Sequence, residues 1–157
     1  MAEPYEEILE GETHRRNAPG ARHEKICSFL HEQVTASLAA ISSSRLLPPR
    51  SVIQLSPGTI IRPDLALITA ANNRLWLAAE IINTEDHRQD TVLKKQIYED
   101  SGLPRLWMID PRYDNIEIYH GGTYGLALQH ILASKEILTE KLLPNLRIEI
   151  AHLFNGP

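Results

Sequence analysis

Cysteine is nearly absent from this sequence, and long apolar runs are missing altogether. The 157 residues include one cysteine, Cys27, which excludes an internal disulfide framework and is typical of the reducing cytoplasm. No apolar stretch approaches the roughly 18 residues of a bilayer-spanning helix, and the acidic N-terminus lacks a secretory core. We therefore expect a single cytoplasmic domain over residues 1–157, without a membrane partner.

The motifs of several common enzyme classes are also missing. No two of the seven histidines are four residues apart, which excludes the zinc-binding helix of many metalloproteases. A single cysteine argues against a structural zinc site. Gly121-Gly122 fits neither a dinucleotide-binding nor a P-loop spacing, and no Gly-x-Ser-x-Gly motif is present. A catalytic site in this chain has to use other side chains.

The charge balance is mildly unfavourable for nucleic-acid binding. The formal net charge is −4, whereas binding to phosphates depends on Lys and Arg. Local basic pairs at Arg15-Arg16, Arg22-His23 and Lys94-Lys95 could still contact DNA. A homodimer, which the sequence leaves open, would double these pairs.

Two carboxylates are embedded in apolar runs. Asp64 opens the run 65–68, and Glu80 lies within the run 75–82. Burying a carboxylate in such a strand is costly unless the group is paired or holds a cation. Asn72-Asn73 predicts a turn between the two runs, so we expect an antiparallel hairpin.

The length of this turn decides whether the two carboxylates meet. With a loop over residues 71–73, Ala70 pairs with Arg74 and Asp64 lies opposite Glu80, with their Cβ atoms about 4.5–5.5 Å apart. A two-residue turn would shift the pairing by one and place them on opposite faces. We expect the first register, in which two ionised carboxylates repel and require a shared proton or a divalent metal ion.

The next segment predicts a helix over residues 84–101, with Thr84 or Asp86 as its N-cap. Three polar side chains recur at a spacing of four and share one helix face: Asp90, Lys94 and Tyr98. We expect Lys94 to reach back toward the carboxylate pair. Two carboxylates and a lysine suit metal-assisted phosphodiester hydrolysis, with Mg²⁺ or Mn²⁺ on the carboxylates and the lysine facing the developing negative charge.

These residues resemble those of a nuclease superfamily. Pro63-Asp64, then Glu80, then Asp-x-x-x-Lys-x-x-x-Tyr over residues 90–98 follow the order of the PD-(D/E)XK nucleases. The closer likeness is to a bacterial family of restriction-endonuclease-like proteins of unknown function that is common in cyanobacteria. That family continues with a pattern matched by residues 102–111. The resemblance covers roughly residues 5 to 120.

The resemblance implies an α/β fold with a restriction-endonuclease-like core, made of a helix, a three-stranded meander, a crossover helix and a further strand, with extra C-terminal strands. It implies Asp64, Glu80 and Lys94 as catalytic residues, with Asp64 and Glu80 holding the metal ion. Tyr98 and Asp90 would contact these catalytic groups and hold them in place, without binding the metal ion themselves. The superfamily's usual Glu-x-Lys would place the lysine at Ile82, so the resemblance implies that Lys94 takes over its role.

Three functions are compatible with this pattern. The leading one is a Mg²⁺-dependent endonuclease acting on DNA. The second is a catalytically silent member that serves as an oligomeric or DNA-binding module, favoured by the missing Glu-x-Lys and the acidic balance. The third is a hydrolase of another phosphate ester. In a purely structural explanation, Asp90 and Lys94 form an exposed ion pair worth about 0.3–0.5 kcal/mol, and Tyr98 only packs its ring.

The rest of the chain predicts further elements and two approaching side chains. Glu12 or His23 could come near the site, although a solvated surface and a helix start explain them more simply. The predicted elements are an amphipathic helix over 21–44, strands over 51–55 and 106–109, an edge strand over 115–119, weaker strands over 126–132 and 136–138, and a strand or short helical tail over 143–154. We expect strand 106–109 to lie parallel to the strand that holds Glu80.

Overall fold

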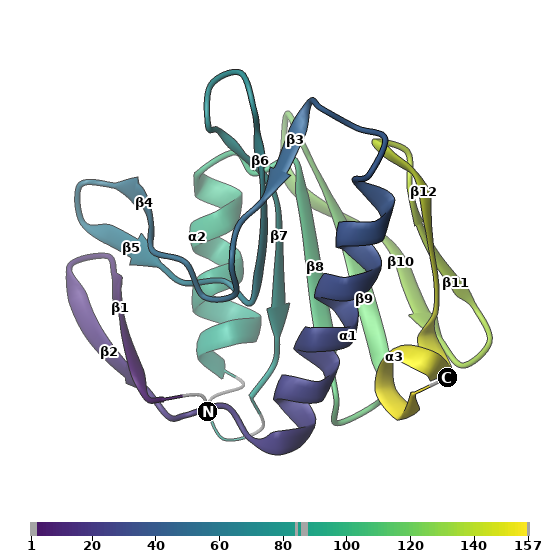
Figure 1. Ribbon diagram of the computed structural model, residues 1–157. Helices are drawn as coiled ribbons and strands as arrows, with labels where there is room; N and C mark the ends of the chain where they lie inside the picture. The colour runs from purple at the N-terminus through teal and green to yellow at the C-terminus, as the bar shows by residue number, and fades with distance from the viewer. Residues whose placement is uncertain (1–2, 84, 86–87, 157) are drawn as a thin grey trace.

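The computed structural model describes residues 3–83, 85 and 88–156. A six-stranded mixed sheet forms its centre (Figure 1). In spatial order its strands are β10 (Gly125–Ala133), β9 (Asn115–Gly122), β8 (Arg105–Asp110), β7 (Leu75–Ile81), β6 (Leu65–Thr69) and β3 (Ser44–Leu46). No helix among the described residues has the length and apolarity needed to cross a bilayer.

Helices cover both faces of this sheet. One face packs against α1 (Ala21–Ser37), and the other packs against α2 (Lys95–Asp100), which continues the π-helix η1 (Gln89–Lys94). Leu77 and Ala79 face α1, whereas Ala78 faces α2. Because side chains alternate along a strand, Glu80 lies on the α2 face.

Two smaller sheets complete the fold. A four-stranded sheet in the order β2-β1-β5-β4 lies beside α2, and the hairpin β11–β12 with α3 closes the far side of α1 (Figure 1). Their bounds are β1 (Tyr5–Leu9), β2 (Glu12–Arg16), β4 (Ile53–Ser56), β5 (Thr59–Ile61), β11 (Ile137–Glu140), β12 (Leu143–Glu149) and α3 (Ile150–Asn155). The first sheet brings the N-terminal hairpin against the helix that carries Lys94.

The β6–β7 hairpin has the expected register near the carboxylates, although its turn differs from the prediction. Thr69 and not Ala70 pairs with Arg74, through a 2.8 Å hydrogen bond, so the loop is one residue longer than expected. A bulge after Leu67 restores the pairing, and Leu65 lies opposite Ala79. The paired register ends at Leu65; extended by one residue, it would place Asp64, which precedes β6, opposite Glu80.

One predicted boundary is wrong, and one predicted strand lies outside the main sheet. The first helix ends at Ser37 rather than near residue 44, because Ser44–Leu46 leaves it to form β3 and pairs with β6. Serine competes with the helix backbone for hydrogen bonds, which favours this exit. The first strand of the meander in the main sheet is therefore β3, while the predicted strand 51–55 corresponds to β4 in the smaller sheet.

The C-terminal half agrees with most of the predictions. β8 lies parallel to β7, with Glu80 opposite Met108. β9 is not an edge strand, because β10 pairs along its whole length. The tail forms both predicted alternatives in succession, strand β12 and then helix α3. The predicted N-caps of the crossover helix, Thr84 and Asp86, lie outside the described residues.

Candidate active site

Asp64 is buried at the point where the chain enters β6, and its carboxylate has several partners. Its Oδ2 accepts a 2.8 Å hydrogen bond from the N–H of Ile81, the residue after Glu80, and lies 3.5 Å from Nε2 of His23. Its Oδ1 accepts from Arg50 at 3.0 Å. Burial alone would raise the pKa of Asp64, but the hydrogen bond and charge of His23, together with the Ile81 N–H, hold it below its usual value.

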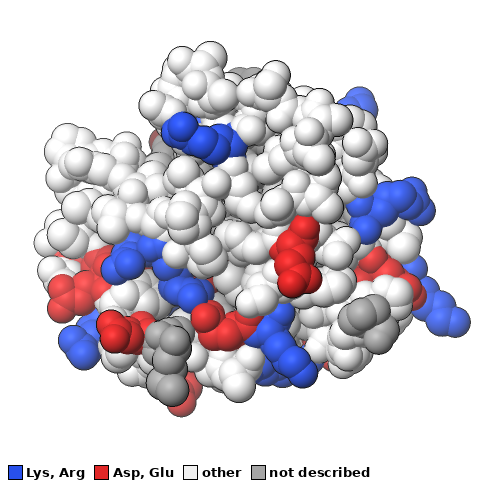
Figure 2. All heavy atoms as spheres, in the orientation of Figure 1, with Lys and Arg blue, Asp and Glu red and all other residues white. Residues whose placement is uncertain are grey.

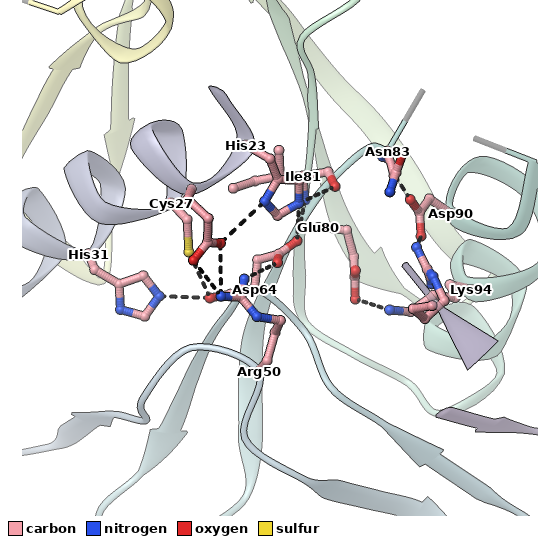
Figure 3. Close-up of polar contacts among 12 residues, drawn as sticks. His23, Cys27, His31, Arg50, Asp64, Glu80, Ile81, Asn83, Asp90 and Lys94 are labelled. Atoms are coloured by element: carbon pink, nitrogen blue, oxygen red, sulfur yellow. Dashed lines mark hydrogen bonds and ion pairs between the residues drawn. The ribbon is translucent and has the colours of Figure 1, made fainter. Parts of the chain in front are cut away.

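Glu80 meets the side chains that the helix face predicts. Lys94 Nζ lies 2.8 Å from Oε2 of Glu80, and the Tyr98 hydroxyl donates a short hydrogen bond to the same oxygen. Lys94 is completely buried and Glu80 is 2% exposed. None of the hydrogen bonds found among the described residues ends on the other oxygen of Glu80, Oε1. Glu80 and Lys94 therefore meet as expected, and one carboxylate oxygen is left for another ligand (Figure 3).

A buried charge cluster extends from this pair to the N-terminal hairpin. Glu7 of β1 accepts from Lys94 at 2.8 Å and from Arg16 of β2 at 2.8 Å. The second terminal nitrogen of Arg16 donates to Asp90 at 2.7 Å, and Asp90 also accepts from the Asn83 N–H at 3.1 Å. We call Glu7, Arg16, Glu80, Asp90 and Lys94 the buried charge cluster; none of them is more than 3% exposed.

This cluster holds three carboxylates and two cations, so it has one negative charge in excess. Burial raises the pKa of Glu80 to about 8, because desolvation and the charges of Glu7, Asp64 and Asp90 outweigh the opposing effect of Lys94. The proton belongs on Oε1, since Oε2 already accepts a hydrogen bond from Tyr98 and forms the ion pair with Lys94. The metal-free protein thus removes the excess charge with a proton, which a cation could replace.

Asp90 and Lys94 do not form the exposed ion pair of the purely structural explanation. Both side chains are fully buried. Asp90 bonds to Arg16 and Lys94 to two glutamates, so each has a partner from another part of the chain. The π-helix η1 aims both residues at the N-terminal hairpin, and short π-helical segments are frequent at functional sites.

Glu12 and His23, the two side chains that could come near the site, differ in where they lie. Glu12 is exposed, as expected. His23 lies in the first turn of α1, which confirms the helix start, but it also approaches the site: its Nε2 is 3.1 Å from the Ile81 carbonyl oxygen (Figure 3).

Sequence reasoning missed Glu7 and Arg50 altogether, and it noted Arg16 only as part of a basic pair. Glu7 had a weak signal, because it alternates with Tyr5 and Leu9 on the inward face of a short strand. Arg50 had none. Its backbone adopts the left-handed conformation, with φ 57°, and its guanidinium bridges Asp64 and Glu24.

The donor set suits Mg²⁺ or Mn²⁺. Asp64 and Glu80 offer hard carboxylate oxygens, and Oε1 of Glu80 has no partner among the described residues. Within the described ranges no three His, Cys, Asp or Glu side chains are grouped to hold a metal ion. Mg²⁺ usually keeps several waters and takes only one or two protein carboxylates, so a pair is sufficient.

Cys27 provides a chemical reporter of the site. Its thiol is 3% exposed and lies 3.6 Å from the Asp64 carbonyl oxygen. Burial, reinforced by the charge of Asp64, raises the pKa of Cys27 to about 12. Because the thiolate is the reactive form, alkylation of native protein at pH 8 should be at least about 1,000-fold slower than alkylation in urea. Similar rates in the two states, followed by mass spectrometry, would contradict this packing.

Comparison with known proteins identifies the family. Over residues 2–151 the chain matches the sequence model of the family described as "Putative restriction endonuclease", Uma2. A crystal structure described as a "putative nuclease belonging to DUF820", from Anabaena variabilis, is similar with a TM-score of 0.80 at 15% identity, covering 98% of this chain and 92% of that chain. No curated protein matches.

The structural likeness, at this level of identity, concerns the fold alone. It confirms the expected α/β, restriction-endonuclease-like architecture. The family match supports a nuclease-like function. This chain belongs to the Uma2 family of putative restriction endonucleases.

Proposed function

We propose that this protein is a Mg²⁺-dependent nuclease that hydrolyses DNA phosphodiester bonds, with Asp64 and Glu80 as metal ligands and Lys94 as the group that faces the charged transition state. The observation that carries this proposal is the excess negative charge of the buried charge cluster beside Asp64, at a carboxylate whose Oε1 has no partner among the described residues. A divalent cation would neutralise the excess charge and would also give Oε1 of Glu80 a partner.

Each residue has a defined part in this reaction. Asp64 and Glu80 would hold Mg²⁺, which supplies Lewis acidity and lowers the pKa of a water molecule. Lys94 has three N–H donors, of which two bond to Glu7 and Glu80. The third can donate to a phosphate oxygen as its negative charge grows. Tyr98 and Asp90 keep Glu80 and Arg16 in place through their hydrogen bonds.

The surface in view suggests that DNA contact is local. Lys and Arg side chains on this face are interspersed with Asp and Glu, and no continuous basic stripe is visible there (Figure 2). With a net charge of −4, binding would depend on short-range contacts at the site, and because few phosphates would be neutralised by Lys and Arg, the affinity would depend only weakly on salt.

A second candidate function is the catalytically silent module. The complete burial of Lys94 favours it, because a lysine that contacts substrate has to become accessible. In that case the buried charge cluster would serve only to fix the fold. Metal binding separates the two candidates, and it needs no assumption about the substrate.

The first test is a calorimetric Mn²⁺ titration of wild type beside Asp64→Asn. We expect binding in wild type and an affinity at least about tenfold weaker in the variant, since a neutral amide is a poorer ligand than a carboxylate. Glu140→Gln is the matched control: Glu140 is also a buried carboxylate, paired with Arg105 at 2.6 Å, but it lies on β11 outside the site.

The outcomes separate the candidates. Wild-type binding that Asp64→Asn weakens and Glu140→Gln retains supports the proposal. Absence of binding in wild type, also in the presence of DNA, favours the silent module. Where metal binds, cleavage of linear, circular and branched DNA is compared with that of small phosphodiesters. Cleavage of the small esters alone would replace the nuclease proposal with a hydrolase of another phosphate ester.

A further inference from the structure

The ammonium of Lys94 is held by two carboxylates from distant parts of the chain, one near the N-terminus and one in the middle. Its Nζ lies 2.8 Å from Oε2 of Glu80 and 2.8 Å from Oε2 of Glu7. Glu80 belongs to the proposed metal site, whereas no motif of the sequence assigns Glu7 a role. The contact between Glu7 and Lys94 joins residues 87 positions apart.

Glu7 itself is fixed from several directions. Besides Lys94, its Oε2 accepts a 2.8 Å hydrogen bond from the N–H of Arg62, and its Oε1 accepts from Arg16 at 2.8 Å. The side chain is completely buried on β1, which pairs with both β2 and β5. A carboxylate anchored in this way cannot follow the lysine, so it defines where the ammonium lies.

Arg16 ties the same anchor to the helix that carries Lys94. Its guanidinium donates to Glu7 of β1 and to Asp90 of η1, one turn before Lys94. The N-terminal hairpin is thus bonded both to the lysine side chain and to its supporting helix. This double attachment sets the position of η1 relative to the hairpin.

We propose that Glu7 is a positioning residue, which keeps the Lys94 ammonium in place while Glu80 binds a metal ion. This inference rests on the proposed function of the site. A lysine on a flexible four-carbon stem, held by Glu80 alone, would be held weakly, because a proton in the metal-free site and a cation in the loaded site each take up the charge of that carboxylate. Glu7 binds no metal in this scheme, so its carboxylate stays available to the Lys94 ammonium. The N-terminal hairpin therefore contributes to the site the residue that holds the Lys94 ammonium.

The direct test observes the Lys94 ammonium by ¹⁵N NMR in lysine-labelled protein, with and without Mg²⁺. In wild type we expect a slowly exchanging ammonium resonance, assigned by its loss in Lys94→Met, under both conditions. In Glu7→Gln this resonance should broaden in the metal-free protein and disappear into rapid exchange when Mg²⁺ is added, while Glu140→Gln should keep it under both conditions. An unchanged resonance in Mg²⁺-loaded Glu7→Gln would overturn the inference.

The kinetic test asks whether Glu7 acts through Lys94. Glu7→Gln should lower the cleavage rate about 10- to 100-fold, because misplacing a catalytic group by about 1 Å can cost about 10²-fold, while the Mn²⁺ affinity stays within about threefold. In a Lys94→Met background the same change should have almost no further effect. Full additivity of the two substitutions would contradict a role through Lys94.

Two arrangements keep the test decisive. If Glu7→Gln does not fold, Glu7→Asp takes its place, because aspartate keeps the charge but is one methylene too short to reach Lys94. If wild type neither binds metal nor cleaves DNA, the proposed function fails. The ammonium resonance of the metal-free proteins then still decides whether Glu7 holds Lys94, because it should broaden in Glu7→Asp and not in Glu140→Gln.

Discussion

Replacing Lys94 by methionine should lower the free energy of unfolding by about 3–5 kcal/mol at pH 9, the cost of leaving buried charges without a partner. Methionine fills a similar volume, so the loss reflects charge rather than packing. In the variant Glu7 and Glu80 face each other across the site that the ammonium occupied, so at pH 9 Glu80 must either keep a charge without that partner or bind a proton from a solution that holds few.

The same substitution should cost much less at pH 6. The pKa of Glu80 is about 8 in the wild-type protein, and removal of Lys94 raises it further, because Lys94 is the group that lowers it. At pH 6 Glu80 is therefore protonated, and Glu7 keeps Arg16 as its counter-ion. The destabilisation should thus grow with pH, which a loss of packing would not do.

Urea unfolding at pH 6 and pH 9 measures this difference. Lys95→Met is the matched control, because Lys95 is the next residue and is only half-buried, with its ammonium 4.5 Å from the Tyr119 ring. A cation–π contact of this kind is worth about 0.5–1 kcal/mol, at either pH. Equal costs for Lys94→Met at the two pH values would show that Glu80 does not titrate in this range.

The buried charge cluster is a costly arrangement, and the proposed site gives a reason for it. Five buried charged groups are weak evidence for stability, since apolar side chains of similar volume would often stabilise a fold as well or better. Their arrangement places a protonated carboxylate beside a second carboxylate and an oriented ammonium. The metal site proposed above would use these groups, and such a use agrees with the nuclease-like function that the family supports.

Local sequence patterns were sufficient to predict the part of the site that lies on two strands and one helix. The apolar runs around Asp64 and Glu80 predicted the hairpin, and the four-residue spacing predicted that Lys94 turns toward Glu80. The turn prediction was wrong by one residue, and a bulge after Leu67 corrected the register. No local signal specifies such a bulge, since it is a property of the paired strands together.

The remaining site residues depend on contacts that spacing along the chain does not encode. Asp90 looked like an exposed partner of Lys94, because both stand on one helix face. It is buried because Arg16, 74 residues earlier, comes to it from the N-terminal hairpin. Arg50 reaches Asp64 from a loop in a left-handed conformation. Such positions follow from the packing of the smaller sheet against η1.

Glu80→Gln should have opposite effects on function and on stability. Cleavage should fall by about 1,000-fold or more and Mn²⁺ binding should be lost, because the amide replaces one of two carboxylate ligands. The free energy of unfolding, in contrast, should rise relative to wild type as the pH increases from 5 to 8. Glutamine is close in shape to the protonated glutamate that the metal-free site holds.

The sign follows from proton linkage. The pKa of Glu80 is raised from an ordinary value near 4.5 to about 8 in the folded protein. Between these values the native state holds a proton that the unfolded chain has released. The contribution of Glu80 to wild-type stability is therefore fully present below pH 4.5 and falls by up to about 1.4 kcal/mol per pH unit as the pH approaches 8. Glutamine has no proton to lose at this position.

The measurement is the difference in unfolding free energy between Glu80→Gln and wild type at pH 5, 6.5 and 8. Taking the difference cancels the titration of all other groups that the two proteins share. Glu140→Gln, compared in the same way, should show no such trend and should keep metal binding. A variant that loses metal binding and is also destabilised equally at every pH would mean that Glu80 is needed in its ionised form to hold Lys94. The cluster would then carry no proton for a metal ion to displace.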